Sequence, residues 1–144
     1  MDARRNGRQR RSGMAMLETL IVLPVLLMVL FAIAEFSVVF SRWQTLSNAA
    51  REGARTAIVF RAPCVAASVE TEVRQRVIDY AASGGITLAG DQIDVQGVCG
   101  NSTTNSRVQV TAPYTFSVVG GLAPSLSPTI NTVGTSVMRN EGTG

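Results

Sequence analysis

An uninterrupted apolar segment dominates the first quarter of this sequence. From Leu20 to Ala34 there is no polar side chain. The longer stretch from Met14 to Ala34 would form a helix about 31 Å long, at ~1.5 Å per residue, which is enough to cross the hydrocarbon core of a bilayer. Residues 14–40 are therefore predicted to be the transmembrane half of one long helix, with the rest of the chain attached to this anchor.

The positive charge of the chain is concentrated in front of the apolar segment. Residues 1–13 contain five arginines and one aspartate, a net charge of +4, whereas residues 14–144 contain eight arginines and nine acids, a net charge of −1. Arginines beside a span favour a cytoplasmic N-terminus. Residues 1–13 are predicted to be a disordered, basic cytoplasmic leader, and the C-terminal part is predicted to be exported. The basic pI gives no indication of nucleic-acid binding, and none is expected.

The composition restricts the chemistry that the chain can perform. It contains no histidine and no lysine, and it has two cysteines. Histidine-based acid–base catalysis, Ser-His-Asp triads and most zinc sites are therefore excluded. No clustered nucleophile or phosphate-binding loop is present, so we expect a protein that is not an enzyme and has no cofactor or metal.

The two cysteines, Cys64 and Cys99, follow the apolar segment and would share one compartment. If that compartment is oxidising, one disulfide is the economical interpretation, and two buried free thiols are the alternative. The bridge would contribute roughly 3–4 kcal/mol on the chain-entropy account.

Two residues interrupt the expected span. Glu18 places a carboxylate near hydrocarbon, where an acid is costly and usually has a partner and a function. A cut before Met14 would supply that partner, a new α-amino group one helical turn away. Pro24 removes one backbone hydrogen bond and is expected to kink or loosen the helix, either as an ordinary kink or with a packing role.

After Ala34 the sequence becomes amphipathic without a stop signal. Residues 41–62 are predicted to be the amphipathic half of the same helix, which would run from about Ala15 to Arg61 and end before Pro63. Trp43 lies where the helix is expected to leave the membrane on its outer side, at the lipid–water interface. The predicted apolar stripe consists of Phe36, Val39, Phe40, Trp43, Leu46, Ala50, Gly53, Ala54, Ala57 and Ile58.

A set of motifs over residues 12–58 resembles the TadE-like family, minor pseudopilins of the tight-adherence (Flp) type IV pilus system. Gly13 stands five residues before Glu18, as in the class III signal of type IV pilins. The more specific elements are Leu17-Glu18-Thr19-Leu20-Ile21-Val22-Leu23-Pro24, Glu35-Phe36 and Asn48-Ala49-Ala50-Arg51-Glu52-Gly53-Ala54-Arg55. The closing residues 136–141 are also similar to the C-terminal strand of that family.

The resemblance implies a processing site and a set of partners. A membrane prepilin peptidase would cut between Gly13 and Met14, and Glu18 would be the pilin-type glutamate that pairs with the new amine. The implied partners are the peptidase, other pilins and minor pseudopilins, the inner-membrane assembly platform and membrane lipid. No chemistry is implied for Arg51, Glu52 and Arg55, which are either a solvated, salt-bridged face or a contact with the chain's own sheet or a partner.

Residues 63–139 are predicted to be a periplasmic α+β domain, followed by a tail at 140–144. A helix over Cys64–Ala82, with Val69, Val73, Val77 and Tyr80 on one face, would end at Gly84-Gly85 and have acids in its first turn. Three antiparallel strands are expected around 93–99, 108–116 and 133–137, with a loop at 120–128. The chain would thus be a pilin-like α+β fold built on a long N-terminal helix.

Two other functions fit parts of the sequence. A secreted binding module could use residues 1–34 as an ordinary signal peptide, because Ala32-Ile33-Ala34 fits the small-x-small cleavage rule. An uncleaved single-pass protein with a sensory or scaffold domain is the other alternative. The mature N-terminus discriminates among the three.

Overall fold

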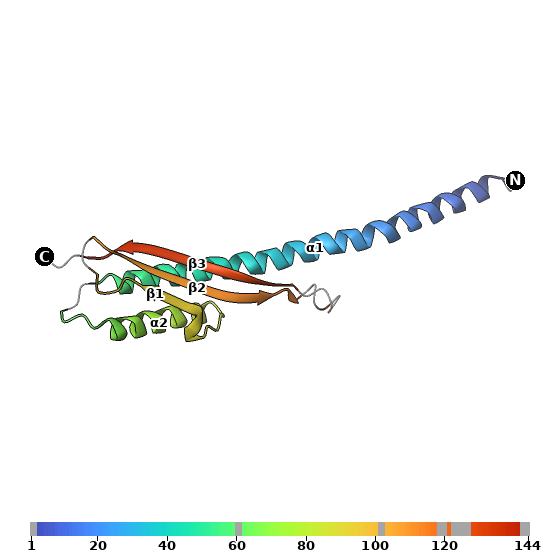
Figure 1. Ribbon diagram of the computed structural model, residues 1–144. Coiled ribbons are helices and arrows are strands. Elements are labelled where there is room, and N and C mark those ends of the chain that lie inside the picture. Colours follow the sequence, from blue (N-terminus) through green and yellow to red (C-terminus); the bar gives the residue numbers. More distant parts are fainter. Residues whose placement is uncertain (1–2, 60–61, 101–102, 118–120, 122–127, 142–144) are drawn as a thin grey trace. The chain divides into compact units, whose positions relative to one another are not determined.

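The computed structural model describes residues 3–59, 62–100, 103–117, 121 and 128–141, with side chains described from residue 14 onward (Figure 1). Two compact units, Met1–Ser37 and Val38–Gly144, are described in turn. Helix α1 (Ala3–Ala57) contributes to both.

In the first unit, α1 is a continuous helix that exposes its apolar side chains. It runs through Pro24 without ending, although that proline lacks the amide proton that a helix interior uses. Every side chain from Met14 to Ala34 is exposed. The leader expected to be disordered is helical from Ala3, which corrects that prediction. Residues 3–13 contain no proline and include several good helix formers, so the helix propagates backward through them.

In the second unit, α1 ends at Ala57, four residues earlier than predicted. The amide of Ile58 still bonds to the Ala54 carbonyl (3.2 Å), but the Ile58 carbonyl accepts the amide of Glu141 (3.3 Å). The Ile58 carbonyl is therefore bonded to a residue that follows β3, and not to an amide of a further turn of α1.

Helix α2 (Ala66–Ser83) follows and packs with the sheet. Val69, Val73 and Val77 are buried as predicted, but the fourth buried position is Ala81, not Tyr80, which is exposed. Steps of four along α2 place Ala81, and not Tyr80, beneath the preceding valines. The predicted acids are not in the first turn, because Glu70 and Glu72 are the fifth and seventh residues of a helix that begins at Ala66. It ends at Gly84, and Gly85 has a φ of 74°.

A three-stranded antiparallel sheet covers the helices, in the order β1-β2-β3. A 3-10 turn, η1 (Gly90–Gln92), leads into β1 (Ile93–Gln96), and β2 (Asn105–Thr115) and β3 (Thr129–Arg139) follow. In the register, Val95 lies opposite Val108, and Val108 lies opposite Ser136. The α+β fold with three antiparallel strands is confirmed. The predicted loop at 120–128 lies almost entirely outside the described residues.

The third strand is longer than predicted, and it buries small residues and not its valines. It spans 11 residues, and Val133 and Val137 are exposed, whereas Thr132, Gly134 and Ser136 face the interior. A Cβ at Gly134 would lie 2.6 Å from the backbone carbonyl of Leu46. The strand therefore places its small residues inward because it runs almost against the backbone of α1.

Asn140 was predicted to begin a tail, but it is buried, with 5% of its surface exposed. Its amide nitrogen donates to the Gly97 carbonyl (2.9 Å) and to Thr104 Oγ1 (2.9 Å), its amide oxygen accepts from Ser106 Oγ, and its backbone N–H donates to the Thr104 carbonyl (3.1 Å). Because each polar atom of the buried amide is satisfied, Asn140 closes this end of the sheet. Residues 142–144 lie outside the described chain.

Cys64 and Cys99 are brought together as a disulfide with a Cα–Cα distance of 5.7 Å and a sequence separation of 35. It joins the segment before α2 to the segment after β1. The sequence left open a disulfide or two free thiols, and the structure contains the disulfide.

Replacing both cysteines with alanine is expected to lower the Tm of the domain by about 10 °C or more, because the bridge restricts the unfolded chain by about 3 kcal/mol. The measurement is thermal unfolding of the full chain in detergent micelles, followed by circular dichroism, with and without reductant. The wild-type protein should respond to reductant and the double variant should not. Equal Tm values in all four samples would contradict this stabilising role.

Candidate functional site

The motif at Asn48–Arg55 divides into two faces of α1. One face is buried; we call it the packing face, and its members are all small except one leucine: Leu46, Ala49, Ala50, Gly53, Ala54 and Ala57. Asn48, Arg51 and Arg55 are exposed on the opposite side, and Glu52 is half-buried at the boundary. This pattern follows from 3.6 residues per turn, since positions 46, 50, 53 and 57 fall on one stripe.

Gly53 is the point of closest approach in the packing face. A Cβ built there would lie 2.5 Å from Val77 Cγ2, 3.3 Å from Val108 Cγ1 and 3.5 Å from Val73 Cγ1. The position therefore meets α2 and β2 at once, and only a glycine leaves both elements in place. Nearby, a Cβ at Gly84 would lie 2.5 Å from Thr45 Cγ2, which shows a second close approach of α2 to α1.

Forming the packing face is thus the structural role of the small residues of this motif. The small residues let a helix lie against both another helix and a sheet, and the core cluster they join consists almost entirely of valine, alanine, leucine and isoleucine. Sequence reasoning placed Leu46, Ala50, Gly53, Ala54 and Ala57 correctly on the stripe. The N-terminal members of the predicted stripe, Phe36, Phe40 and Trp43, are exposed and do not join the core.

The charged members of the motif lie on the solvated side. Glu52 Oε1 is 3.5 Å from Arg76 Nε of α2, and both side chains are partly exposed, so the pair contributes little to stability. Arg51 and Arg55 are exposed. Within the described part of this chain, Arg51 and Arg55 lie on a solvated face and Glu52 makes an ion pair with α2.

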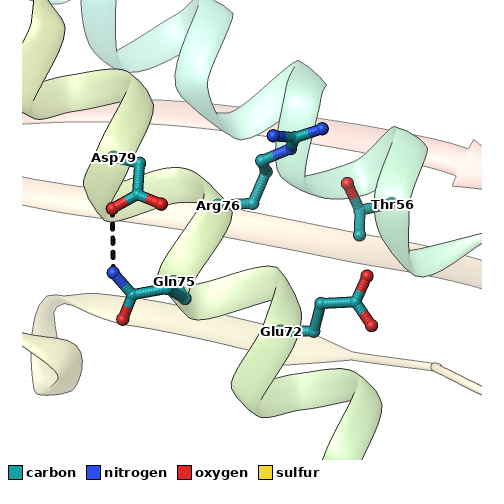
Figure 2. A pocket seen from close by; sticks show the side chains of 5 residues that line it. All are labelled: Thr56, Glu72, Gln75, Arg76 and Asp79. Atoms are coloured by element: carbon teal, nitrogen blue, oxygen red, sulfur yellow. Dashed lines mark hydrogen bonds between the residues drawn. The ribbon is translucent and has the colours of Figure 1, made fainter.

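Beside this ion pair lies a hollow of about 320 Å³, lined by Thr56, Glu72, Gln75, Arg76 and Asp79 (Figure 2). Figure 2 shows Arg76 pointing from α2 toward α1, with Glu72 and Asp79 on either side of it along α2. Gln75 Nε2 donates to Asp79 Oδ1 (2.8 Å). Among the described residues, no group of three or more His, Cys, Asp or Glu side chains could hold a metal ion.

The predicted processing residues belong to the first unit. Met14 and Glu18 are exposed side chains of α1, and Thr19 Oγ1 donates to the Ala15 carbonyl one turn back (2.9 Å). The side chain of residue 13 lies outside the described set. The amine that would pair with Glu18 forms only on cleavage, so this pairing remains a prediction.

These features define a class of protein: a small α+β domain continuous with one helix long and apolar enough to cross a membrane. That candidate span is Met14–Ala57, with a mean hydropathy of 2.6 in its most apolar window and none of that window buried. The arrangement is consistent with a single-pass membrane protein.

Residues 13–55 match the family model described as TadE-like protein, a family associated with Tad pilus systems. The match covers the apolar segment and the packing-face motif, and it confirms the resemblance drawn from those residues. No curated protein and no solved structure matches the chain.

Proposed function

We propose that this chain is a minor pseudopilin, a non-catalytic structural component of Tad/Flp pilus assembly in the bacterial inner membrane. In this proposal the N-terminus is cytoplasmic and the disulfide-bonded domain is periplasmic. A prepilin peptidase cuts between Gly13 and Met14, and the protein then joins other pilins or pseudopilins at the inner-membrane assembly platform.

The observation that carries the proposal is the fully exposed apolar surface of α1 from Met14 to Ala34. Such a surface is unstable in water and requires lipid or other apolar helices around it. The family match begins at residue 13, so it includes the predicted cleavage site as well as the helix. These two observations together favour an anchor that is kept after processing over one that is discarded.

The proposed mechanism is helix packing, with one electrostatic constraint. The exposed apolar side chains would pack against the corresponding helices of neighbouring subunits. Glu18 lies one turn from Met14, so a new amine at Met14 would neutralise the carboxylate inside the assembly. Nothing in this mechanism requires catalysis by the chain itself.

The mature N-terminus tests the proposal. We expect mass spectrometry of the protein purified from cells to give a chain that begins at Met14. In cells that lack the prepilin peptidase, we expect the uncut chain that begins at Met1. This comparison is its own control, because the same sequence is measured with and without the enzyme.

The alternatives predict different masses. A chain beginning at Glu35 would indicate an ordinary signal peptide and a secreted binding module, and it would contradict the proposal. A chain that keeps residues 1–13 in wild-type cells would indicate an uncleaved single-pass scaffold. If the N-terminus is still Met14 in cells that lack the prepilin peptidase, a different enzyme makes the cut, and that part of the proposal is contradicted.

A further inference from the structure

The two ends of the sheet lie at two different levels along α1. At one end the guanidinium of Arg42 lies 5.2 Å from the centroid of the Tyr114 ring, next to the point where β2 ends and β3 begins. At the other end the amide of Glu141 bonds to the carbonyl of Ile58. The Tyr114 end of the sheet is therefore the end nearer Val38, where the second unit begins.

The sheet reaches slightly further along α1 than Arg42. Phe116 lies two residues beyond Tyr114, or about 7 Å along an extended strand, which corresponds to four or five residues of helix. Because Tyr114 lies beside Arg42 and β2 and β3 run alongside this part of α1 (Figure 1), Phe116 lies nearer the start of the second unit than Tyr114 does. Ile130 pairs with Tyr114 in the register, so it lies at the same end of the sheet.

Exposed apolar side chains gather at this level. Phe40 and Trp43 are each 46% exposed, and their rings lie 5.7 Å apart. Ile130 is 39% exposed, and Phe116 contacts the Tyr114 ring edge-on at 5.5 Å. We call the set Phe40, Arg42, Trp43, Phe116 and Ile130 the aromatic end of the domain. Phe40, Trp43 and Ile130 are not members of the hydrophobic core, so core packing does not explain them.

The aromatic end has the composition of a membrane interface. Aromatic rings are enriched at the headgroup level, and arginine keeps its charge in water while its stem covers apolar surface. The apolar segment from Met14 to Ala34 is long enough to fill the hydrocarbon core, so the outer headgroup layer falls on the residues of α1 that follow Ala34. The aromatic end begins about six residues, or ~9 Å of helix, beyond Ala34.

We propose that the aromatic end rests in the headgroup layer of a phospholipid bilayer, so that β2 and β3 contact the membrane through Phe116 and Ile130 in addition to the contact made by α1. The proposal rests on the membrane anchoring in the proposed function and goes beyond it. Two contacts, one through the helix and one through the sheet, would restrict the tilt of the domain on the membrane before assembly.

The chain has one tryptophan, so its intrinsic fluorescence reports on Trp43 alone. The full chain is reconstituted into vesicles of phosphatidylcholine and phosphatidylglycerol, with or without lipids brominated high on the acyl chain. Trp43→Phe/Ile130→Trp then moves the single probe to the aromatic end of the sheet. Trp43→Phe/Val137→Trp is the matched control, because Val137 is a more exposed residue of the same strand (54%), about 23 Å further along it.

We expect brominated lipid to quench Trp43 and the probe at position 130 to a similar extent, and to quench the probe at position 137 about two-fold less or not at all, since the headgroup layer is thin compared with the strand. Aqueous acrylamide should show the reverse order. All three positions are exposed, so the core stays unchanged, and near-wild-type circular dichroism checks this.

Different outcomes would contradict the membrane anchoring through α1 and the contact of the sheet with lipid. If Trp43 is quenched and position 130 is quenched no more than position 137, the anchor stands and the contact of the sheet is overturned. If neither Trp43 nor position 130 is quenched, the membrane anchoring fails as well. If position 130 is shielded from acrylamide only at high protein-to-lipid ratios and is not quenched by brominated lipid, a second copy covers it, and the lipid contact is again overturned.

Discussion

Substituting leucine for Gly53 is expected to destabilise the α+β domain by about 3 kcal/mol or more. A single Cβ would already lie 2.5 Å from Val77 Cγ2, and three further carbons have no space between α1, α2 and β2. Overpacking of this kind costs about 1–3 kcal/mol and occasionally more. Because two elements are blocked at once, we expect the upper end of that range or beyond, against a typical total stability of 5–15 kcal/mol.

The measurement is chemical unfolding of the full chain in micelles, with Asn48→Leu as the control. Asn48 is exposed on the opposite side of the same helix, so leucine there should change stability by less than about 0.5 kcal/mol. The milder Gly53→Ala adds only the Cβ and gains about 1 kcal/mol of helix propensity, which partly offsets the clash.

Val77 provides a direct check on the cause of the Gly53 effect. If the contact with Val77 is responsible, Gly53→Ala combined with Val77→Ala should be more stable than the sum of the two single changes predicts, by about 0.5–3 kcal/mol. Strict additivity would show that the clash is relieved elsewhere. A Gly53→Leu protein as stable as wild type would contradict the geometry of the packing face.

Replacing Glu18 with alanine is expected to give a protein that is cleaved normally but enters pili or pseudopili about ten-fold less, because a new amine left unpaired among apolar helices costs a few kcal/mol. The measurement is the amount of the protein in the sheared pilus fraction relative to the membrane. Normal cleavage is expected, since the substitution leaves Gly13 and Met14 unchanged.

Two variants sharpen the Glu18 test. Thr19→Ala, at the adjacent exposed position, removes only a hydroxyl bonded to the Ala15 carbonyl and should leave incorporation unchanged. Glu18→Gln keeps the size of the side chain and removes the charge, so it should behave like alanine if ion pairing is the cause. Full incorporation of the alanine variant would contradict the proposed role of the carboxylate.

Several features of this protein could be predicted from local sequence because they depend on local physics. The apolar segment, the buried valines of α2 at steps of four and the alternation in β2 are set by periodicity. The packing-face motif was found by its resemblance to a family, but its role was not. The pairs Ala49-Ala50 and Gly53-Ala54 do not indicate how closely a neighbouring helix or strand approaches α1.

Other features could not be predicted from local sequence, because contacts between segments far apart in the chain determine them. Tyr80 and Ala81 continue the apolar face of α2 at steps of three and four, and the packing of α2 buries Ala81 and leaves Tyr80 exposed. The inward face of β3 carries threonine, glycine and serine because α1 lies almost against it, which inverts the usual expectation that valine is inside. Asn140 has no local pattern that would mark it as buried.

The sequence by itself determined that this chain has an apolar helix, a basic leader, a TadE-like motif and a small α+β domain, because composition and periodicity act over neighbouring residues. Only the tertiary structure decided where the sheet ends along α1, which motif residues lie against the core and which apolar side chains are left outside it. Those properties depend on the distance between backbones that are far apart in sequence, and no local pattern encodes that distance.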